Sequence, residues 1–144
     1  MNRGGYKQHS QYSQVQIKTA NKGKLIVLLY QGAIRFMKRS LMLLKKNDLE
    51  GKGNALIRAQ DIILELLYCL DQGLLDQSDE LALNLQRLYL YAYRRLVYAN
   101  VHMDTEAVEE GIKLMENMLQ AWEQVFSGDG GAGQVPSPGM ALTG

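Results

Sequence analysis

The chain has 144 residues, a length that fits one domain with a continuous hydrophobic core. Its 16 basic and 15 acidic residues give a net charge of +1, which argues against nucleic acid or an anionic membrane surface as a partner. The one cysteine, Cys69, excludes an internal disulfide and fits a reducing compartment. Its apolar neighbours predict a buried structural thiol.

Residues 1–21 are polar and lack the apolar stretch of a secretory signal, so we expect a flexible N-terminal arm. Tyr6 and Tyr12 lie in this arm, and such aromatic anchors can dock a mobile segment into a groove of the folded body. A disordered leader is the alternative. No apolar run is long enough to cross a bilayer, and we interpret the protein as cytoplasmic and soluble.

Residues 25–44 are the most apolar stretch and predict a helix from Lys22 to about Lys46, capped by Thr19 or Asn21. At helical spacing the stretch has two apolar stripes rather than one. Either the helix touches several neighbours of its own bundle, or the second stripe binds a partner. One stripe contains Ile26, Tyr30, Ala33, Met37, Leu41 and Leu44; the other contains Leu25, Leu28, Gly32, Phe36 and Leu43.

Asn47, Asp48, Gly51 and Gly53 predict a break, after which a second helix is expected over about 54–70. Beside its main seam runs a second apolar row, so this helix too is apolar over more than one narrow face. The seam consists of Leu56, Ala59, Ile63, Leu66 and Leu70, and the row beside it of Ile57, Leu64, Leu67 and Tyr68.

A third helix is expected over about 78–100, started by Asp76 or Ser78 after a loop at residues 71–73. Four of the eight tyrosines fall within one ten-residue stretch of this helix, and such clusters usually mark boundaries between apolar and wet surroundings. The apolar face consists of Leu81, Leu85, Leu88, Ala92, Leu96 and Ala99; the tyrosines are Tyr89, Tyr91, Tyr93 and Tyr98.

A fourth helix, capped by Asp104 or Thr105, has the clearest amphipathic pattern, with apolar residues alternately four and three apart. They are Val108, Ile112, Met115, Leu119, Trp122 and Phe126. Short connections favour antiparallel neighbours, so the fold class is all-α, an antiparallel up-down four-helix bundle over residues 22–126. Residues 127–144 are rich in Gly, Ser and Pro and predict a disordered tail.

The sequence does not point to an enzyme. Neither His9 nor His102 has a Glu three residues before it, as inward-facing di-iron pairs need, and no nucleotide-binding or nucleophile motif occurs. We therefore predict no catalytic residue, no metal ligand and no cofactor. Two interpretations remain: a module whose surplus apolar surface binds an amphipathic partner, or a structural bundle that self-associates through that surface.

Several segments in order resemble the FliS family of flagellin-specific export chaperones, over about residues 6–122. The chain departs from the family pattern at Lys22, Gln31 and Leu90. The resemblance is carried by Tyr6 and Tyr12 before Val15 and Thr19, Leu25 with LYQGA at 29–33, AQDIILEL at 59–66, Asn84 and Leu85 with LYLY at 88–91, RRLVYAN at 94–100, and Asp104 with Ala121 and Trp122.

The resemblance implies a cytoplasmic chaperone that binds the disordered C-terminal region of flagellin, prevents premature polymerisation and delivers the subunit to the flagellar type III export apparatus. It also implies that the arm with Tyr6 and Tyr12 can cover part of the partner site. A monomer or weak dimer with the export gate as a further partner is expected; a self-associating bundle without a client is the alternative. We predict that the groove is formed or supported by Leu25, Leu28, Leu29, Tyr30, Ile34, Tyr89, Tyr93 and Leu96.

Overall fold

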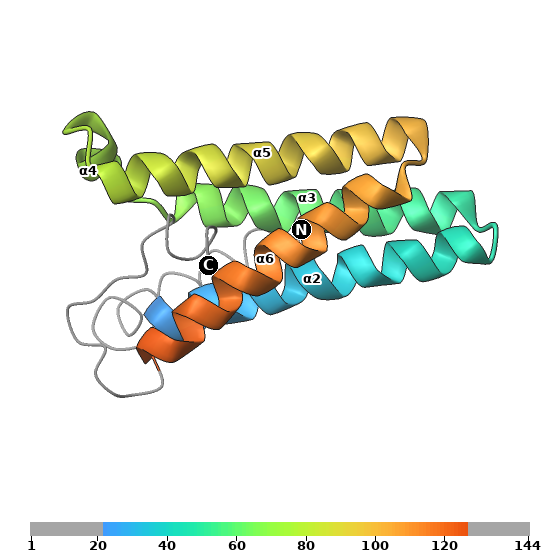
Figure 1. The fold of residues 1–144 in the computed structure, drawn as a ribbon, viewed down its shortest axis with the longest axis horizontal. Helices are drawn as coiled ribbons and strands as arrows, with labels where there is room; N and C mark the ends of the chain where they lie inside the picture. Colours follow the sequence, from blue (N-terminus) through green and yellow to red (C-terminus); the bar gives the residue numbers. More distant parts are fainter. Residues whose placement is uncertain (1–21, 127–144) are drawn as a thin grey trace, which may run out of the picture.

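The computed structural model describes residues 22–126, which form five helices and no strand (Figure 1). The predictions for the N-terminal arm and the C-terminal tail lie outside these residues. The helices are α2 (Lys22–Lys45), α3 (Leu49–Tyr68), α4 (Gln72–Asp76), α5 (Glu80–His102) and α6 (Thr105–Phe126).

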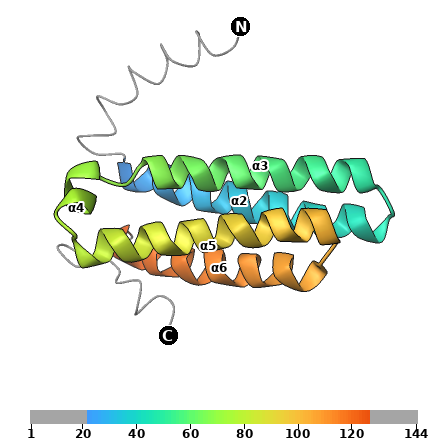
Figure 2. The same ribbon diagram turned by 90° about the horizontal axis from the view of Figure 1, so that it is seen from above.

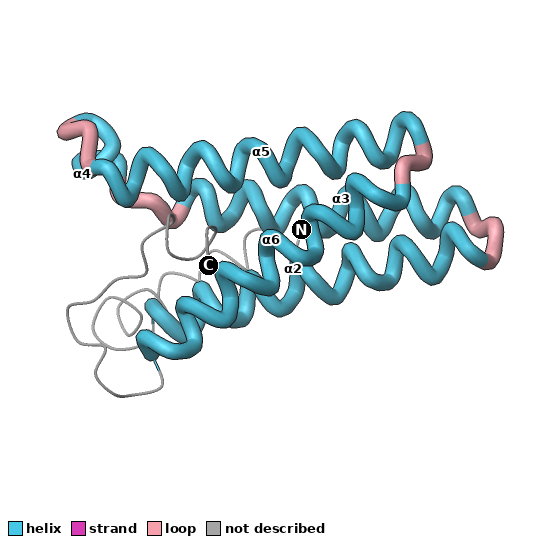
Figure 3. The backbone as a smooth tube through the Cα atoms, viewed as in Figure 1, coloured by secondary structure: helices cyan, strands magenta, loops and turns pink. Residues whose placement is uncertain are grey.

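The four long helices run alternately in opposite directions, and α2 and α5 each pack between α3 and α6 (Figure 2). Short loops connect them, while α4 sits at one end of the bundle and packs against α5 (Figure 3). The predicted all-α bundle is therefore confirmed, with one short helix added to the four expected. Because each long helix touches two neighbours, each needs an apolar arc wider than a single stripe.

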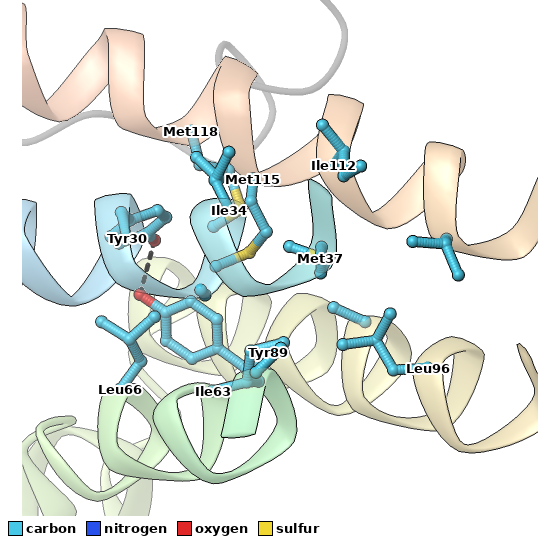
Figure 4. Packing of buried hydrophobic residues seen from close by; sticks show 14 of the residues in the cluster. Tyr30, Ile34, Met37, Ile63, Leu66, Tyr89, Leu96, Ile112, Met115 and Met118 are labelled. Carbon is cyan, nitrogen blue, oxygen red and sulfur yellow. Dashed lines mark hydrogen bonds between the residues drawn. The ribbon is translucent and has the colours of Figure 1, made fainter. Parts of the chain in front are cut away.

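Both apolar stripes of α2 are explained in large part by this arrangement. Tyr30, Ala33 and Met37 of the first stripe are fully buried in the core. Figure 4 shows Tyr30 and Met37 among the core side chains. The second stripe lies toward α3, where a methyl group added to Gly32 would approach Ile62 Cδ1 to 3.3 Å. The exception is Leu28, which stays 58% exposed.

The expected break at Gly51 and Gly53 is wrong, because α3 already begins at Leu49. Asp48 caps the helix: its Oδ1 accepts a hydrogen bond from Gly51 N at 2.9 Å, which satisfies a first-turn amide. A methyl group at residue 51 would lie 2.6 Å from the Asp48 carboxylate. Gly51 thus allows the cap to approach closely, while Gly53 faces Asn100 across the α3–α5 contact.

The start of α5 also differs from the prediction. Asp79 is the N-cap, with its Oδ2 accepting from Ala82 N at 3.0 Å, whereas Ser78 adopts a left-handed φ of 59° and Asp76 ends α4. The predicted loop at residues 71–73 instead contains the cap and first turn of α4. Several residues in this region can cap a helix. The chain uses two of them in succession, Asp71 for α4 and Asp79 for α5.

The expected fourth helix is found as α6. Asp104 caps it by accepting from Glu106 N and Ala107 N through Oδ1, at 3.0 and 3.3 Å. Of its heptad-like residues, Val108, Ile112, Met115 and Trp122 are buried. This pattern predicted its buried face correctly because α6 packs in the bundle along most of its length.

Candidate functional site

An apolar cavity of about 350 Å³ opens at the end of the bundle where α2 begins and α3 ends, beside α4. Side chains from all five helices and from the connections at residues 69–71 and 77–79 surround it. Its lining consists of Lys22, Ile26, Leu66, Cys69, Leu70, Asp71, Leu74, Asp79, Leu81, Ala82, Leu85, Tyr89 and Trp122.

Helix α4 borders the cavity but does not fill it. Asp71 caps this short helix by accepting from Gly73 N and Leu74 N, which turns the chain away from the axis of α3. None of the residues of α4 is buried, and Leu74 borders the cavity while remaining 42% exposed. The space is large enough to accept one or two bulky apolar side chains from a partner.

A buried chain of hydrogen bonds forms one wall of the cavity. Trp122 Nε1 donates to the Tyr30 hydroxyl at 3.1 Å, and the Tyr30 and Tyr89 hydroxyls lie 2.7 Å apart (Figure 4). Burial raises the pKa of both phenols, so both stay neutral at physiological pH. The chain joins α2, α5 and α6 and brings Trp122, the single tryptophan, to the cavity wall.

The polar groups at the cavity favour binding over chemistry. Asp71 and Asp79 are engaged as helix caps. Cys69 is half-buried rather than fully buried as predicted, and burial, aided by Glu65, raises the pKa of its thiol. A raised pKa keeps the thiol protonated and poorly nucleophilic.

A second apolar surface flanks the seam between α3 and α5. Gly53 and Asn100 face each other across this seam, and the helical period places Ile57 and Val97 on the same side of the molecule. Tyr68 is 75% exposed and Val101 71%. We name this surface the α3–α5 face and define it as Ile57, Leu64, Tyr68, Tyr93, Val97 and Val101.

The predicted groove residues divide into three groups. Leu28 is exposed and can touch a partner directly. Leu25, Leu29 and Tyr93 are half-buried, and the last two pack against the core. The core contains Tyr30, Ile34, Tyr89 and Leu96, which can support a surface but not form its outer layer. Their part in binding remains a prediction, and Tyr6 and Tyr12 lie outside the described residues.

Sequence reasoning did not select the most exposed members of the α3–α5 face. The signal was present for Ile57 and Tyr68, which form part of the second apolar row beside the α3 seam. The sequence pattern does not single out Val97 and Val101 as surface residues, because the tyrosines around them dominate the pattern of α5. Exposure distinguishes these residues from the seam, and exposure depends on which helices lie next to them.

Residues 22–126 contain no helix that is long and apolar enough to cross a membrane. No group of three His, Cys, Asp or Glu side chains within this range is placed to hold a metal ion.

Comparison with known proteins identifies the family. Residues 5–129 match the family model described as Flagellar protein FliS. The chain is 37% identical over 119 residues to the flagellar secretion chaperone FliS of Salmonella typhimurium, covering 79% of this chain and 86% of that protein. It is 32% identical over 121 residues to the Bacillus subtilis FliS chaperone, covering 84% and 87%.

The FliS chaperone of Escherichia coli is 35% identical over 118 residues, covering 78% of this chain and 85% of that protein. The matched range includes every helix described above, the cavity and the α3–α5 face. The family consists of chaperones and not enzymes, in agreement with the prediction from sequence. The chain therefore belongs to the FliS family of flagellar secretion chaperones.

Proposed function

We propose that this protein binds the disordered C-terminal segment of flagellin in the cytoplasm, prevents its premature polymerisation and delivers it to the flagellar type III export apparatus. The observation that carries the proposal is the surplus of apolar surface. An open apolar cavity and the exposed α3–α5 face occur together on a bundle whose core is already filled.

The proposed client has to cover an extended surface rather than a single pocket. Ordering one residue of a flexible segment costs about 1–2 kcal/mol. Burial of apolar surface contributes about 25 cal/mol per Å², so each ordered residue has to bury roughly 40–80 Å² to compensate. A segment that anchors side chains in the cavity and continues along the α3–α5 face meets this requirement better than one confined to either site.

The N-terminal arm is proposed as a reversible cover. Lys22 begins α2 and also lines the cavity, so the preceding residues join the bundle at the edge of this site. Tyr6 and Tyr12 carry rings suited to an apolar cavity. Client binding then displaces the arm.

Calorimetric titration of the purified protein with a C-terminal flagellin peptide from its own organism tests the proposal. We expect binding at a 1:1 ratio with a large negative heat-capacity change, the signature of buried apolar surface. The mass of the free protein in solution is measured in parallel. A tight dimer that does not bind the peptide favours the self-associating bundle, and a monomer that does not bind it contradicts the chaperone function.

Two variants locate the binding surface. Val101→Lys places a charge on the α3–α5 face, and Ala82→Phe introduces a ring at the cavity lining. Each is expected to weaken peptide binding by about tenfold or more, the equivalent of about 1.4 kcal/mol. Gln120→Lys adds the same charge at an exposed position of α6 and serves as the matched control. Equal affinities for all three variants would place the client elsewhere.

A further inference from the structure

The near-zero net charge conceals a strong asymmetry along the chain. Residues 1–47 contain ten of the 16 basic residues and none of the 15 acidic residues, while residues 48–144 contain six basic and all 15 acidic residues. The first segment therefore carries +10 and the second −9. A partner responds to the local field and not to the sum of the charges, so a net charge near zero is compatible with a charged partner for one segment.

Part of this positive charge lies on one side of helix α2 and the residue that follows it. With 3.6 residues per turn, six residues fall within an arc of about 60° on the side opposite the buried Ala33. All six are exposed. We name this surface the basic face of α2; it consists of Lys24, Leu28, Arg35, Arg39, Met42 and Lys46, the last directly after the helix.

The folded bundle does not compensate these charges. The ion pairs among the described residues are Lys38–Glu116 and Arg95–Glu110, and neither involves a cation of the basic face. Arg35 and Arg39 are four residues apart, where like charges repel on a helix. The first turn of α2 carries no acidic residue, although the positive end of the helix dipole favours one.

Two large apolar side chains interrupt the basic face. Leu28 is 58% exposed and Met42 57%. They lie 14 residues apart, which is close to four helical turns or about 21 Å along the axis. Two apolar residues two heptads apart, with Arg35 at the heptad position between them, match one side of a helix–helix contact in which the cations select the partner.

We propose that the basic face of α2 binds an acidic amphipathic helix of a partner protein, which lies along α2 with its apolar residues on Leu28 and Met42. This interaction goes beyond client binding, since it uses neither the cavity nor the α3–α5 face, and it assigns Leu28, one of the predicted groove residues, to a second partner. The acidic side chains of the partner helix pair with Arg35 and Arg39, and those near its ends pair with Lys24 and Lys46.

The neighbouring helix argues for a narrow partner rather than a flat anionic membrane. Glu109, Glu116 and Glu123 are exposed on α6 at seven-residue intervals, and the Lys38–Glu116 pair, whose Nζ and Oε2 lie 3.0 Å apart, shows that this row borders α2. A flat anionic surface pressed against α2 also meets these carboxylates and is repelled. A single helix lying along α2 avoids most of them.

The first probe is a designed helical peptide of about three heptads, with Leu at every a and d position and Glu at the flanking e and g positions. Its binding to the full-length protein is followed by fluorescence anisotropy at low and physiological salt. We expect binding that weakens as salt rises, and no binding of a matched peptide with Lys in place of Glu.

The test variant is Arg35→Glu with Arg39→Glu, and the matched control is Arg87→Glu with Lys113→Glu, which makes the same charge change on α5 and α6. We expect at least a tenfold loss of affinity for the acidic peptide in the test variant and little change in the control. Circular dichroism verifies that both remain folded. Titration of the test and control variants with the flagellin peptide shows whether client binding changes independently of binding to the acidic peptide.

Three outcomes overturn the proposal: no binding of the acidic peptide, equal loss in the test and control variants, or equal binding of the acidic and basic peptides. Vesicles of equal parts phosphatidylglycerol and phosphatidylcholine form a further arm. Binding to these vesicles that depends on Arg35 and Arg39, without binding of the acidic peptide, replaces the protein partner with a membrane surface.

Discussion

At the scale of single residues, the Tyr30 hydroxyl is a point where three helices meet. It accepts from Trp122 Nε1 and shares a hydrogen bond with Tyr89, whose ring packs edge-on at a centroid distance of 6.2 Å. A buried hydroxyl that loses its partner costs about 1–3 kcal/mol, more than the hydrogen bond contributes net. This site therefore contributes to stability out of proportion to its size.

Tyr30→Phe is expected to lower the free energy of unfolding by about 1–3 kcal/mol, because it removes the oxygen that Trp122 and Tyr89 share. Urea unfolding followed by Trp122 fluorescence measures the change. Tyr98→Phe, at a tyrosine that is 39% exposed, is the control and should differ from wild type by less than about 0.5 kcal/mol. Equal midpoints for the two variants contradict the argument.

The same pair of phenols predicts a loss of stability at alkaline pH. Burial is the main cause that raises the pKa of Tyr30 and of Tyr89 above the ordinary value of 10.0. Below pH 10 both states keep the phenolic protons. Above it the unfolded chain releases protons that the folded chain retains, so the free energy of unfolding falls by up to about 1.4 kcal/mol per pH unit for each tyrosine.

Denaturant unfolding from about pH 8 to about pH 11 measures this slope. The informative quantity is the difference in slope between wild type and Tyr30→Phe, because contributions from groups other than the buried tyrosines are common to both proteins. Since the variant lacks one of the two buried phenols, its slope should be shallower and the difference should narrow as pH rises. A difference that stays constant argues against a contribution from Tyr30.

At the scale of elements, helix starts are decided by side chains that compete to cap. Asp48 begins α3 before two glycines, and Lys52 in the same first turns is buried, with its Nζ 2.9 Å from Asn100 Oδ1 and 3.1 Å from Asn100 O. This contact places a cation at the carboxyl end of α5, where the helix dipole favours it. The start of α3 is thus stabilised by its cap and by α5 together.

Asp48→Ala is expected to cost about 0.5–2 kcal/mol, the usual loss when a capping carboxylate is removed. Amide hydrogen exchange should also become faster in the first turn of α3, at Gly51 above all, because the bond from Gly51 N is lost. Glu50→Ala, at an exposed neighbour, is the control. Unchanged exchange at Gly51 in Asp48→Ala means that the cap does not hold this turn.

At the scale of the whole molecule, three surfaces that we propose to bind partners surround a single core. The cavity and the α3–α5 face are apolar, whereas the basic face of α2 combines charge with two apolar anchors. The N-terminal arm directly precedes Lys22, which lines the cavity. The arm also carries three of the ten basic residues of residues 1–47. Removal of the arm is therefore expected to affect the regulation of binding and not the stability of the bundle.

Deletion of residues 1–18 is expected to change flagellin-peptide affinity without unfolding the bundle. If Tyr6 and Tyr12 compete with the client for the cavity, the deletion tightens binding; a cover closed nine-tenths of the time weakens apparent affinity about tenfold. Calorimetry gives the affinity, and thermal unfolding gives the stability. A bundle that melts after the deletion shows instead that the arm is part of the core.

Much of the fold was readable in the sequence because it depends on local periodicity. Apolar residues three and four apart predicted the four long helices, and α6 matched its heptad pattern in every residue whose burial is described except the half-buried Leu119. The region between α3 and α5 was predicted less well: the sequence favoured Asp76 or Ser78 as the start of α5, whereas Asp71 caps α4 and Asp79 caps α5. Choosing among them requires knowing which start leaves the apolar face of α5 against α3.

The sequence by itself determined the helical class, the approximate extent of four helices and a set of apolar residues larger than one narrow stripe per helix. Only the tertiary structure decided which of these residues are exposed, because periodicity gives the angle between two residues but not the direction of the core. Only the tertiary structure brings Tyr30 into contact with Tyr89, 59 positions later in the chain, and with Trp122, 92 positions later. The cavity likewise arises where five helices fail to fill one space, a property of their packing and not of any single segment.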